Sequence, residues 1–210
     1  MTSPYRLPIT SVVAVTPSWG IGNRGTLPWH CVDKHLPKDL AYFREATTHT
    51  TDVSKRNAVL MGRITWESIP EKNRPLKNRI NFIISKTLQP EIFTENPNVF
   101  VATSLDEALE MIERNARLRE SVEKAVVVGG ARLFDESLFH DWFDTLHLTQ
   151  IHTEFESDTF LPERTCKYLQ QQDLNPYVVH DNIIEDDVPY RIVELPVKGA
   201  AARSIGPQCS

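Results

Sequence analysis

The chain has few cysteines and no hydrophobic run long enough to cross a membrane. Its three cysteines, Cys31, Cys166 and Cys209, are an odd number and include no C-x-x-C pair. This pattern argues against a disulfide framework and against a zinc site, and it fits a reducing compartment. No stretch approaches the ~18 apolar residues of a membrane span, and the first residues lack the apolar core of a signal peptide. We therefore expect a soluble, cytoplasmic protein without a metal site.

An excess of positive charge is also missing. The 210 residues include 23 Lys and Arg against 28 Asp and Glu, which gives a net charge of −5. Nothing in that total attracts nucleic acid or an anionic membrane, so small molecules are the expected partners. The length suits one substantial core, and we expect a single domain over residues 1–195. Gly, Ala, Ser and Pro then dominate residues 196–210, which predicts a flexible C-terminal tail.

Short apolar runs alternate with helical spacing along most of the chain. The runs lack polar alternation, as expected of strands that helices cover on both faces, and they lie at residues 11–15, 58–61, 80–84 and 125–128. Helices are predicted at residues 36–47, 105–119 and 131–138, and Ser104 with Glu107 forms an S-x-x-E capping box before the second of them. Alternating patterns at residues 145–151 and 190–195 favour antiparallel strands.

This order predicts an α/β fold, a three-layer sandwich with a mostly parallel central sheet and an antiparallel C-terminal edge. Ligands of such sheets bind beyond the carboxyl ends of the strands. Functional residues are therefore expected in the loops that follow the strands.

Asp39 occupies an unusual place for a carboxylate. It falls on the apolar stripe that Leu36, Leu40 and Phe43 form on the first predicted helix. One interpretation is that Asp39 only complements the helix dipole from the first turn. The other is a partly buried acid that holds a cationic or amidine-like ligand by charge-assisted hydrogen bonds. The helix alone does not decide between them.

Three turns between a strand and the next element carry residues that suit a phosphate group. They are Gly62, Arg63 and Thr65 after one strand, Ser85 and Lys86 after the next, and Gly129 with Gly130 after a third. Each signal alone is weak, because a glycine pair is usually only a turn and a lysine is usually only solvated. Together they favour a dinucleotide, although the G-x-G-x-x-G fingerprint is absent.

Arg79 differs from the other cations of residues 71–79, most of which form a solvated face. It opens a predicted buried strand, where a fixed guanidinium can grip a carboxylate in fork geometry.

These features, in this order, resemble dihydrofolate reductase over residues 12–160. The strings that carry the resemblance are GIGNRGTLPW, LPKDLAYF, MGRITWESIPEKNRPLKNRIN, VVVGGARLF and FESDTF. The segment SIPEKNRPLK and the chain length are similar to the eukaryotic branch, and we expect the fungal type within it. Three features depart from that pattern. Asp39 stands where eukaryotic relatives usually have Glu, residues 31–35 lengthen the interval between Trp29 and Asp39, and Ile64 replaces a common Lys.

The resemblance implies NADPH-dependent reduction of 7,8-dihydrofolate to 5,6,7,8-tetrahydrofolate, with hydride transfer to pterin C6 and protonation at N5. This reaction belongs to tetrahydrofolate biosynthesis and one-carbon metabolism, and antifolate inhibitors block it. The implied enzyme is a monomer, its catalytic residues are Asp39 and Trp29, and a loop over residues 20–26 closes on the nicotinamide. Since Ile64 carries no charge, Arg63 and Lys86 are expected to select NADPH over NADH.

Further residues are assigned by the same resemblance. The implied substrate-binding residues are Val12, Val13, Asp39, Leu40, Phe43, Arg44, Ile69, Asn73, Leu76, Arg79 and Thr149. The implied cofactor-binding residues are Ala14, Ile21, Gly22, Asn23, Arg24, Gly25, Thr26, Gly62, Arg63, Ile64, Thr65, Ile84, Ser85, Lys86, Thr87, Val128, Gly129, Gly130, Ala131, Arg132, Leu133, Phe134 and Thr159.

Two other functions remain as alternatives. A reductase of the same fold that acts on a ribosyl pyrimidine, as in riboflavin biosynthesis, needs neither LPKDLAYF nor a carboxylate clamp at Arg79. A non-catalytic nucleotide-binding module can also keep a fold, since fold does not imply function. The presence of Asp39, Trp29 and Phe43 argues against that second alternative.

Overall fold

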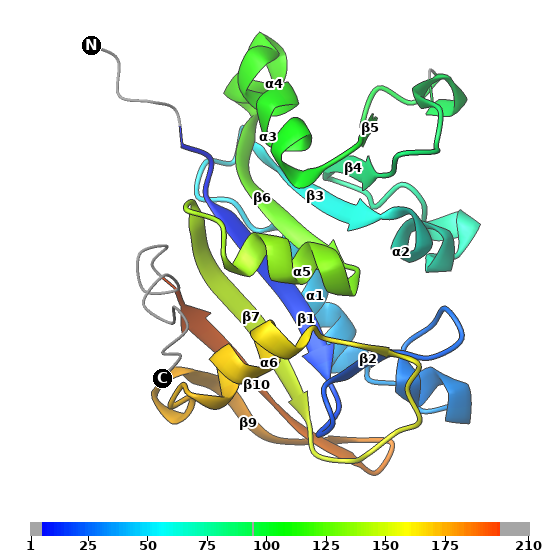
Figure 1. Cartoon of the computed structure of the whole chain (residues 1–210), viewed down its shortest axis with the longest axis vertical. Coiled ribbons are helices and arrows are strands. Elements are labelled where there is room, and N and C mark those ends of the chain that lie inside the picture. The colour runs from blue at the N-terminus through cyan, green and yellow to red at the C-terminus, as the bar shows by residue number, and fades with distance from the viewer. Residues whose placement is uncertain (1–5, 94, 198–210) are drawn as a thin grey trace, which may run out of the picture.

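An eight-stranded sheet runs through the protein (Figure 1), and the computed structural model describes residues 6–93 and 95–197. The strands are β1 (Ile9–Val15), β2 (Gly20–Gly22), β3 (Arg56–Gly62), β4 (Ile80–Ile84), β5 (Val99–Ala102), β6 (Val122–Gly129), β7 (Phe143–Ile151), β8 (Thr159–Phe160), β9 (Val178–Glu185) and β10 (Val188–Pro196). The helices are α1 (Pro37–Thr48), α2 (Arg63–Ser68), α3 (Leu105–Arg114), α4 (Ala116–Ser121), α5 (Ala131–Leu138) and α6 (Glu163–Gln170).

The sheet is parallel except at its C-terminal edge, as predicted. Its order is β5-β4-β3-β6-β1-β7-β10-β9, and β2 pairs separately with β8. All neighbours from β5 to β7 are parallel, whereas β10 is antiparallel to both β7 and β9. The carboxyl ends of β1, β3, β4 and β6 therefore meet at one edge of the sheet.

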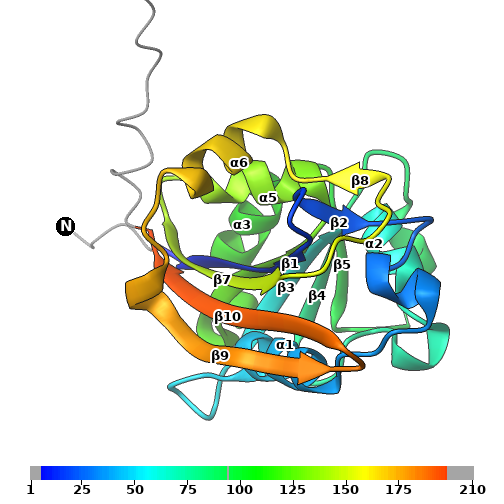
Figure 2. The ribbon, with the colours of Figure 1, turned by 90° about the horizontal axis from the view of Figure 1, so that it is seen from below.

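Helices cover both faces of the sheet, which explains the continuous apolar runs of the central strands. Neighbouring side chains of β1 point to opposite faces. Val12 packs in one cluster with Ala46 of α1, and Val13 packs in another with Leu133 of α5. Figure 2 shows α1 on one side of the sheet and α5 with α6 on the other. In the described residues, no helix has the length and apolar character needed to cross a membrane.

The predicted helix over residues 105–119 is two helices. Ser104 caps α3 as predicted, since its Oγ accepts the Glu107 N–H at 3.1 Å. The helix then ends at Asn115, whose φ of −87° and ψ of 108° are not helical. Asn115 Oδ1 accepts the Leu118 N–H at 3.2 Å and so begins α4. The backbone of Asn115 therefore ends one helix, and its side chain caps the next.

The structure describes the first two residues of the predicted tail, Pro196 and Val197. Pro196 is the last residue of β10 and pairs with Thr145. Val197 is buried, and its N–H donates to the Asp144 carbonyl at 2.6 Å. The prediction that the tail starts at residue 196 is therefore wrong for these two residues, which β7 holds in place. The remaining tail, residues 198–210, lies outside the described residues.

Candidate active site

The carboxyl group of Asp39 lies in the first turn of α1 and faces β7. The Thr149 hydroxyl donates a hydrogen bond to Asp39 Oδ1 at 2.7 Å, and Thr149 is itself buried between β1 and β10. Burial raises the pKa of Asp39 to about 6, the bond from Thr149 opposes that shift, and nearby Glu185 adds to it. The carboxyl group therefore exists in both protonation states near neutral pH, which suits a group that takes part in proton transfer.

Glu185, at the end of β9, completes the surroundings of Asp39. Its carboxylate accepts the Lys38 N–H at 3.0 and 3.2 Å, and the buried Tyr190 hydroxyl donates to it at 2.6 Å. Glu185 thus caps the first turn of α1 from another part of the chain. No local sequence pattern indicates Glu185 or Tyr190, because their contact with α1 depends on the β9–β10 hairpin.

Trp29 packs beneath the loop that precedes α1. Its side chain is only 1% exposed, and it shares a buried cluster with Leu36, Ile151 and Tyr190. The rings of Trp29 and Phe155 are 6.4 Å apart. Trp29 and Asp39 therefore lie at the same end of β7 and β10, as expected for residues of one site.

The longer segment after Trp29 is anchored to the turn between β9 and β10. The chain forms a 3-10 helix at Pro28–Val32. The His35 N–H then donates to Asp186 Oδ2 at 2.8 Å, and Lys34 Nζ lies 3.6 Å from Asp187 Oδ2. The extra residues therefore reach the hairpin that also carries Glu185.

Four of the apolar residues predicted to contact the substrate lie on one side of the sheet, namely Val12, Phe43, Ile69 and Leu76. Phe43, Ile69 and Leu76 are partly buried and pack against the cluster that contains Val12. Leu40 differs, since it is 60% exposed and does not belong to a buried stripe on α1. The prediction of a continuous apolar stripe is therefore wrong at Leu40, which presents its side chain to a ligand or to solvent.

Arg79 is fixed at the other end of this apolar region. It is 7% exposed, Nη1 donates to Thr47 Oγ1 at 2.7 Å, and Nε donates to the Lys77 carbonyl at 3.0 Å. Burial, with the repulsion of Arg44, lowers the pKa of Arg79 to about 10, so the guanidinium stays a cation at neutral pH. Arg44 and Arg79 together place two cations beside the apolar residues, while Asn73 is exposed on the neighbouring loop.

The three phosphate-suited turns come together at the carboxyl edge of the sheet. Gly62 pairs with Ile84, and Met61 pairs with Gly129. Gly129 has a φ of 140°, and a Cβ added there would lie 2.8 Å from Thr65 Oγ1. Only glycine fits this position, because the Thr65 side chain packs against the place where a Cβ would lie. The structure thus brings the first and third turns into contact.

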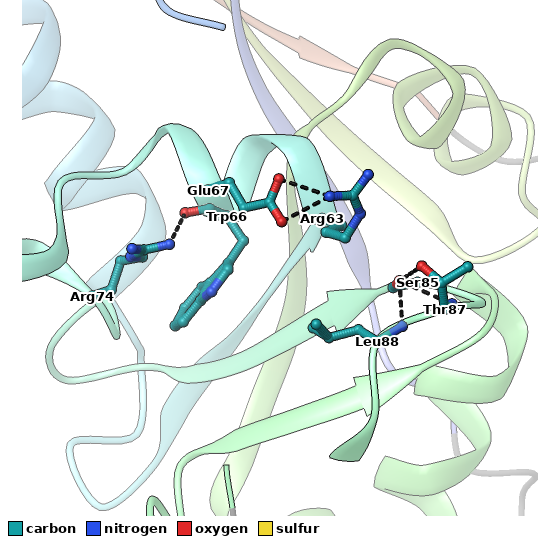
Figure 3. A network of polar contacts seen from close by, with 7 residues as sticks. All are labelled: Arg63, Trp66, Glu67, Arg74, Ser85, Thr87 and Leu88. Atoms are coloured by element: carbon teal, nitrogen blue, oxygen red, sulfur yellow. Dashed lines mark hydrogen bonds and ion pairs between the residues drawn. The ribbon is translucent and has the colours of Figure 1, made fainter. Parts of the chain in front are cut away.

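The side chains of the first two turns form hydrogen bonds within their own segments, as Figure 3 shows. Arg63 Nη1 donates to both carboxylate oxygens of Glu67, at 2.8 and 2.9 Å. Ser85 Oγ accepts the N–H groups of Thr87 and Leu88 at 3.3 and 3.1 Å. Lys86 is exposed, and no ion pair within the described part of the chain involves it. The sequence spacing R-x-x-x-E on α2 is the signal that could have identified Glu67.

The glycine-rich loop of residues 16–26 is tied to residues 154–160. Ser18 donates its N–H and its hydroxyl to Glu154 at 3.0 and 2.6 Å, and the Arg24 N–H donates to Asp158 Oδ2 at 2.7 Å. A Cβ at Gly20 would lie 2.1 Å from Ser157 Oγ, so the two segments touch. Of the cofactor residues expected here, Asn23 is buried, Ile21 and Gly22 are partly buried, and the exposed ones are Arg24, Gly25, Thr26 and Thr159.

Some predicted contact residues direct their side chains elsewhere. Val13, Leu133 and Phe134 are buried in the cluster beneath α5, so only their backbones are available to a ligand. Arg132 is exposed and pairs with Glu136 at 2.6 Å. The other expected residues near these turns are partly buried: Ala14, Ile84, Val128, Gly130 and Ala131.

A cavity of about 350 Å³ lies away from these residues. Its lining includes Arg56, Ile80 and Val99, which begin β3, β4 and β5. Those are the amino ends of the parallel strands. The cavity is therefore at the opposite edge of the sheet from Asp39 and the glycine turns.

Comparisons with known proteins agree with this geometry. The family model described as dihydrofolate reductase matches residues 8–186. The chain is 44% identical to a dihydrofolate reductase of Rattus norvegicus over 158 residues, 74% of this chain and 79% of that protein. A solved structure of Schistosoma mansoni dihydrofolate reductase matches with a TM-score of 0.73 and 31% identity, over 92% of this chain and 100% of that one.

Longer relatives carry a second activity in their names. A bifunctional dihydrofolate reductase-thymidylate synthase of Glycine max is 36% identical over 196 residues, which is 93% of this chain but 35% of that protein. The chain thus spans about a third of this bifunctional relative's length. These relatives are plant and animal proteins, so the fungal type stays a prediction. The family model and the relatives of similar length show that the chain belongs to the dihydrofolate reductase family.

Proposed function

We propose that the chain catalyses the NADPH-dependent reduction of 7,8-dihydrofolate to 5,6,7,8-tetrahydrofolate. The observation that carries this proposal is the Asp39 carboxyl group, which is held by Thr149 and has a pKa of about 6. It faces the same sheet edge as the glycine turns, so an acid and a phosphate-binding region lie at one end of the strands. Membership of the family supports the same reaction.

The chain's residues fit NADPH. The turn at Gly129 and Gly130 suits the pyrophosphate, since the Thr65 hydroxyl packs directly against Gly129 and can add a hydrogen bond. Arg63 and Lys86 supply cations for the 2′-phosphate, and Ser85 supplies a hydroxyl. When bound, NADPH supplies the hydride that reduces C6 of the pterin. The loop over residues 20–26, which the hydrogen bond from the Arg24 N–H to Asp158 anchors, covers this region and excludes bulk solvent.

The substrate lies between Asp39 and Arg79 in this proposal. The pterin packs on Phe43 with its 2-amino and N3 groups on Asp39, and the benzoyl group lies between Ile69 and Leu76. The glutamate α-carboxylate binds Arg79, whose orientation Thr47 fixes. Clamping both ends of the substrate holds C6 in a near-attack position, which supplies a large part of the rate.

Asp39 also governs the proton that N5 must gain. A carboxyl group with a pKa near 6 is partly protonated at neutral pH and polarises the pterin that it binds. Because Asp39 holds the 2-amino and N3 groups, a water near Trp29 carries the proton to N5. Trp29, buried beneath the loop, closes this side of the site.

The test is the loss of NADPH absorbance when dihydrofolate is added to the purified protein, with methotrexate as the inhibitor control. We expect rapid oxidation that methotrexate stops. If NADPH binds but dihydrofolate is not turned over, the substrate assignment is wrong and another pterin or pyrimidine reductase takes its place. Failure of NADPH to bind overturns the proposal as a whole.

We also propose that the enzyme is a cytoplasmic monomer. Cys31 and Cys166 are free thiols in the structure, which agrees with a reducing compartment. Sedimentation of the purified protein tests the monomer, and fluorescence microscopy of a tagged chain tests the location.

A further inference from the structure

Glu67 places a carboxylate beside the cation that is expected to bind the cofactor phosphate. Arg63 Nη1 contacts both of its oxygens, at 2.8 and 2.9 Å, across one turn of α2. The side chains are 44% and 50% exposed, so water and a ligand can reach both. The guanidinium of Arg63 therefore already has an anionic partner before any phosphate arrives.

Few other cations near the expected phosphate site can replace the positive charge of Arg63 that Glu67 offsets. Gly62 and Ile84 are paired residues of β3 and β4. Arg63 follows Gly62 directly and Lys86 lies two residues after Ile84, so the two cations are on neighbouring turns. Ile64, 68% exposed, adds no charge.

Arg74 is engaged elsewhere. Its guanidinium lies 5.5 Å from the Trp66 ring and 3.5 Å from a Glu71 carboxylate oxygen, and it donates to the Trp66 carbonyl (Figure 3). Its charge therefore does not replace the charge of Arg63 that Glu67 offsets.

We propose that Glu67 is a specificity-determining residue that lowers the preference of this enzyme for NADPH over NADH. The inference rests on the proposed function, in which Arg63 contacts the 2′-phosphate. Glu67 competes with the phosphate for the guanidinium and repels its negative charge. The pair is exposed and weak, so a phosphate can displace it, and selectivity is reduced but not abolished.

The same carboxylate favours the cofactor that lacks the phosphate. In nucleotide-binding folds an acidic side chain accepts hydrogen bonds from the ribose hydroxyls of NADH, whereas an arginine accommodates the 2′-phosphate of NADPH. Arg63 and Glu67 place both groups within one turn of α2. Arg63 therefore favours NADPH and Glu67 favours NADH. Each side chain weakens the binding of the cofactor that the other one favours.

Calorimetric titration of the free enzyme with NADPH and with NADH tests the inference without relying on turnover. Glu67→Gln keeps the size of the side chain and removes its charge. We expect the NADPH Kd to fall about three- to ten-fold while the NADH Kd stays constant or rises, and the gain to shrink at high salt. Glu110→Gln is the matched control, because Glu110 pairs with Arg114 at 2.9 Å with the same spacing on α3.

The variant Arg63→Ala distinguishes the role of Glu67 from the phosphate contact that the proposed function assigns to Arg63. It should lower the NADPH preference, and adding Glu67→Gln to it should bring a smaller gain in NADPH affinity than in the wild type, because only the repulsion of the phosphate is then removed. If Arg63→Ala acts but Glu67→Gln leaves the NADPH to NADH ratio unchanged, or strengthens both cofactors equally, the role of Glu67 is overturned and the cofactor site stands. If Arg63→Ala leaves the ratio unchanged, the phosphate contact in the proposed function is wrong.

Discussion

At the scale of single residues, Asp39 combines a partly buried position with a pKa of about 6. The Asp39→Asn substitution keeps the size of the side chain and its acceptor for the Thr149 hydroxyl, but it removes the titrating proton. We expect turnover with dihydrofolate to fall about 10²- to 10⁴-fold, while the NADPH Kd stays nearly constant. Steady-state kinetics and cofactor titration measure the two effects. Unchanged turnover contradicts the assignment of Asp39 to the reaction.

The same substitution should stabilise the fold at neutral pH. The pKa of Asp39 is raised from 3.8 to about 6, so the folded state binds more protons than the unfolded state between these values. The free energy of unfolding therefore falls as the pH rises through this window, and the ionised carboxylate costs roughly 1 to 3 kcal/mol above it. Asp39→Asn removes that cost. Urea unfolding should show the variant more stable at pH 7 and equal to the wild type below about pH 4.

Lys86 is the exposed cation on the turn after β4. We expect Lys86→Ala to weaken NADPH about ten-fold and NADH far less, because only NADPH carries the 2′-phosphate. Titration of the free enzyme with each cofactor gives both dissociation constants. Equal weakening of NADPH and NADH contradicts the role of Lys86 at the phosphate.

At the scale of elements, the hairpin of β9 and β10 sets the charge around the start of α1. Glu185→Gln keeps an oxygen acceptor for the Lys38 N–H but removes a negative charge near Asp39. We expect the pKa of Asp39 to fall, so the pH at which kcat/KM for dihydrofolate declines should move downward. The pH profile of kcat/KM measures this shift.

Asp187→Asn is the control for that experiment. Asp187 belongs to the same turn, its side chain is 97% exposed, and its partner is Lys34 rather than α1. The variant removes an equal charge at a solvated position, so it should leave the pH profile in place. An equal shift in both variants means that the net charge of the turn, and not the contact of Glu185 with α1, controls Asp39.

The sequence predicts the helices and strands that have a local pattern. It does not predict the contacts between elements that are distant in the chain. The bounds of β4 and α5 agree with the predicted ranges because β4 is an apolar run between Arg79 and Ser85, and the helical spacing of α5 begins directly after Gly130. The pattern does not predict β9, since its side chains are mostly exposed and Asn182 interrupts it with a φ of 52°. The pair of Thr149 and Asp39 spans 110 positions, so its geometry needs the whole sheet.

At the scale of the whole molecule, distant parts of the chain supply the proposed cofactor site. The loop of residues 16–26, the turns after β3 and β4, and the Gly129–Gly130 turn before α5 lie apart in the sequence and meet at one sheet edge. In the unfolded chain these segments are separated, so it has no preformed site. NADPH binding should therefore stabilise the fold as a unit.

We expect NADPH at about 100 times its Kd to add roughly 2.7 kcal/mol to the free energy of unfolding, and to raise the Tm by roughly 5 to 10 °C. Thermal unfolding followed by circular dichroism measures this at increasing NADPH concentrations. Lys86→Ala should need about ten-fold more NADPH for the same rise, since its Kd is higher but its fold is unchanged. A rise that is the same in wild type and variant at every concentration would show that Lys86 does not contribute to binding. No rise at all would mean that these turns do not form the cofactor site.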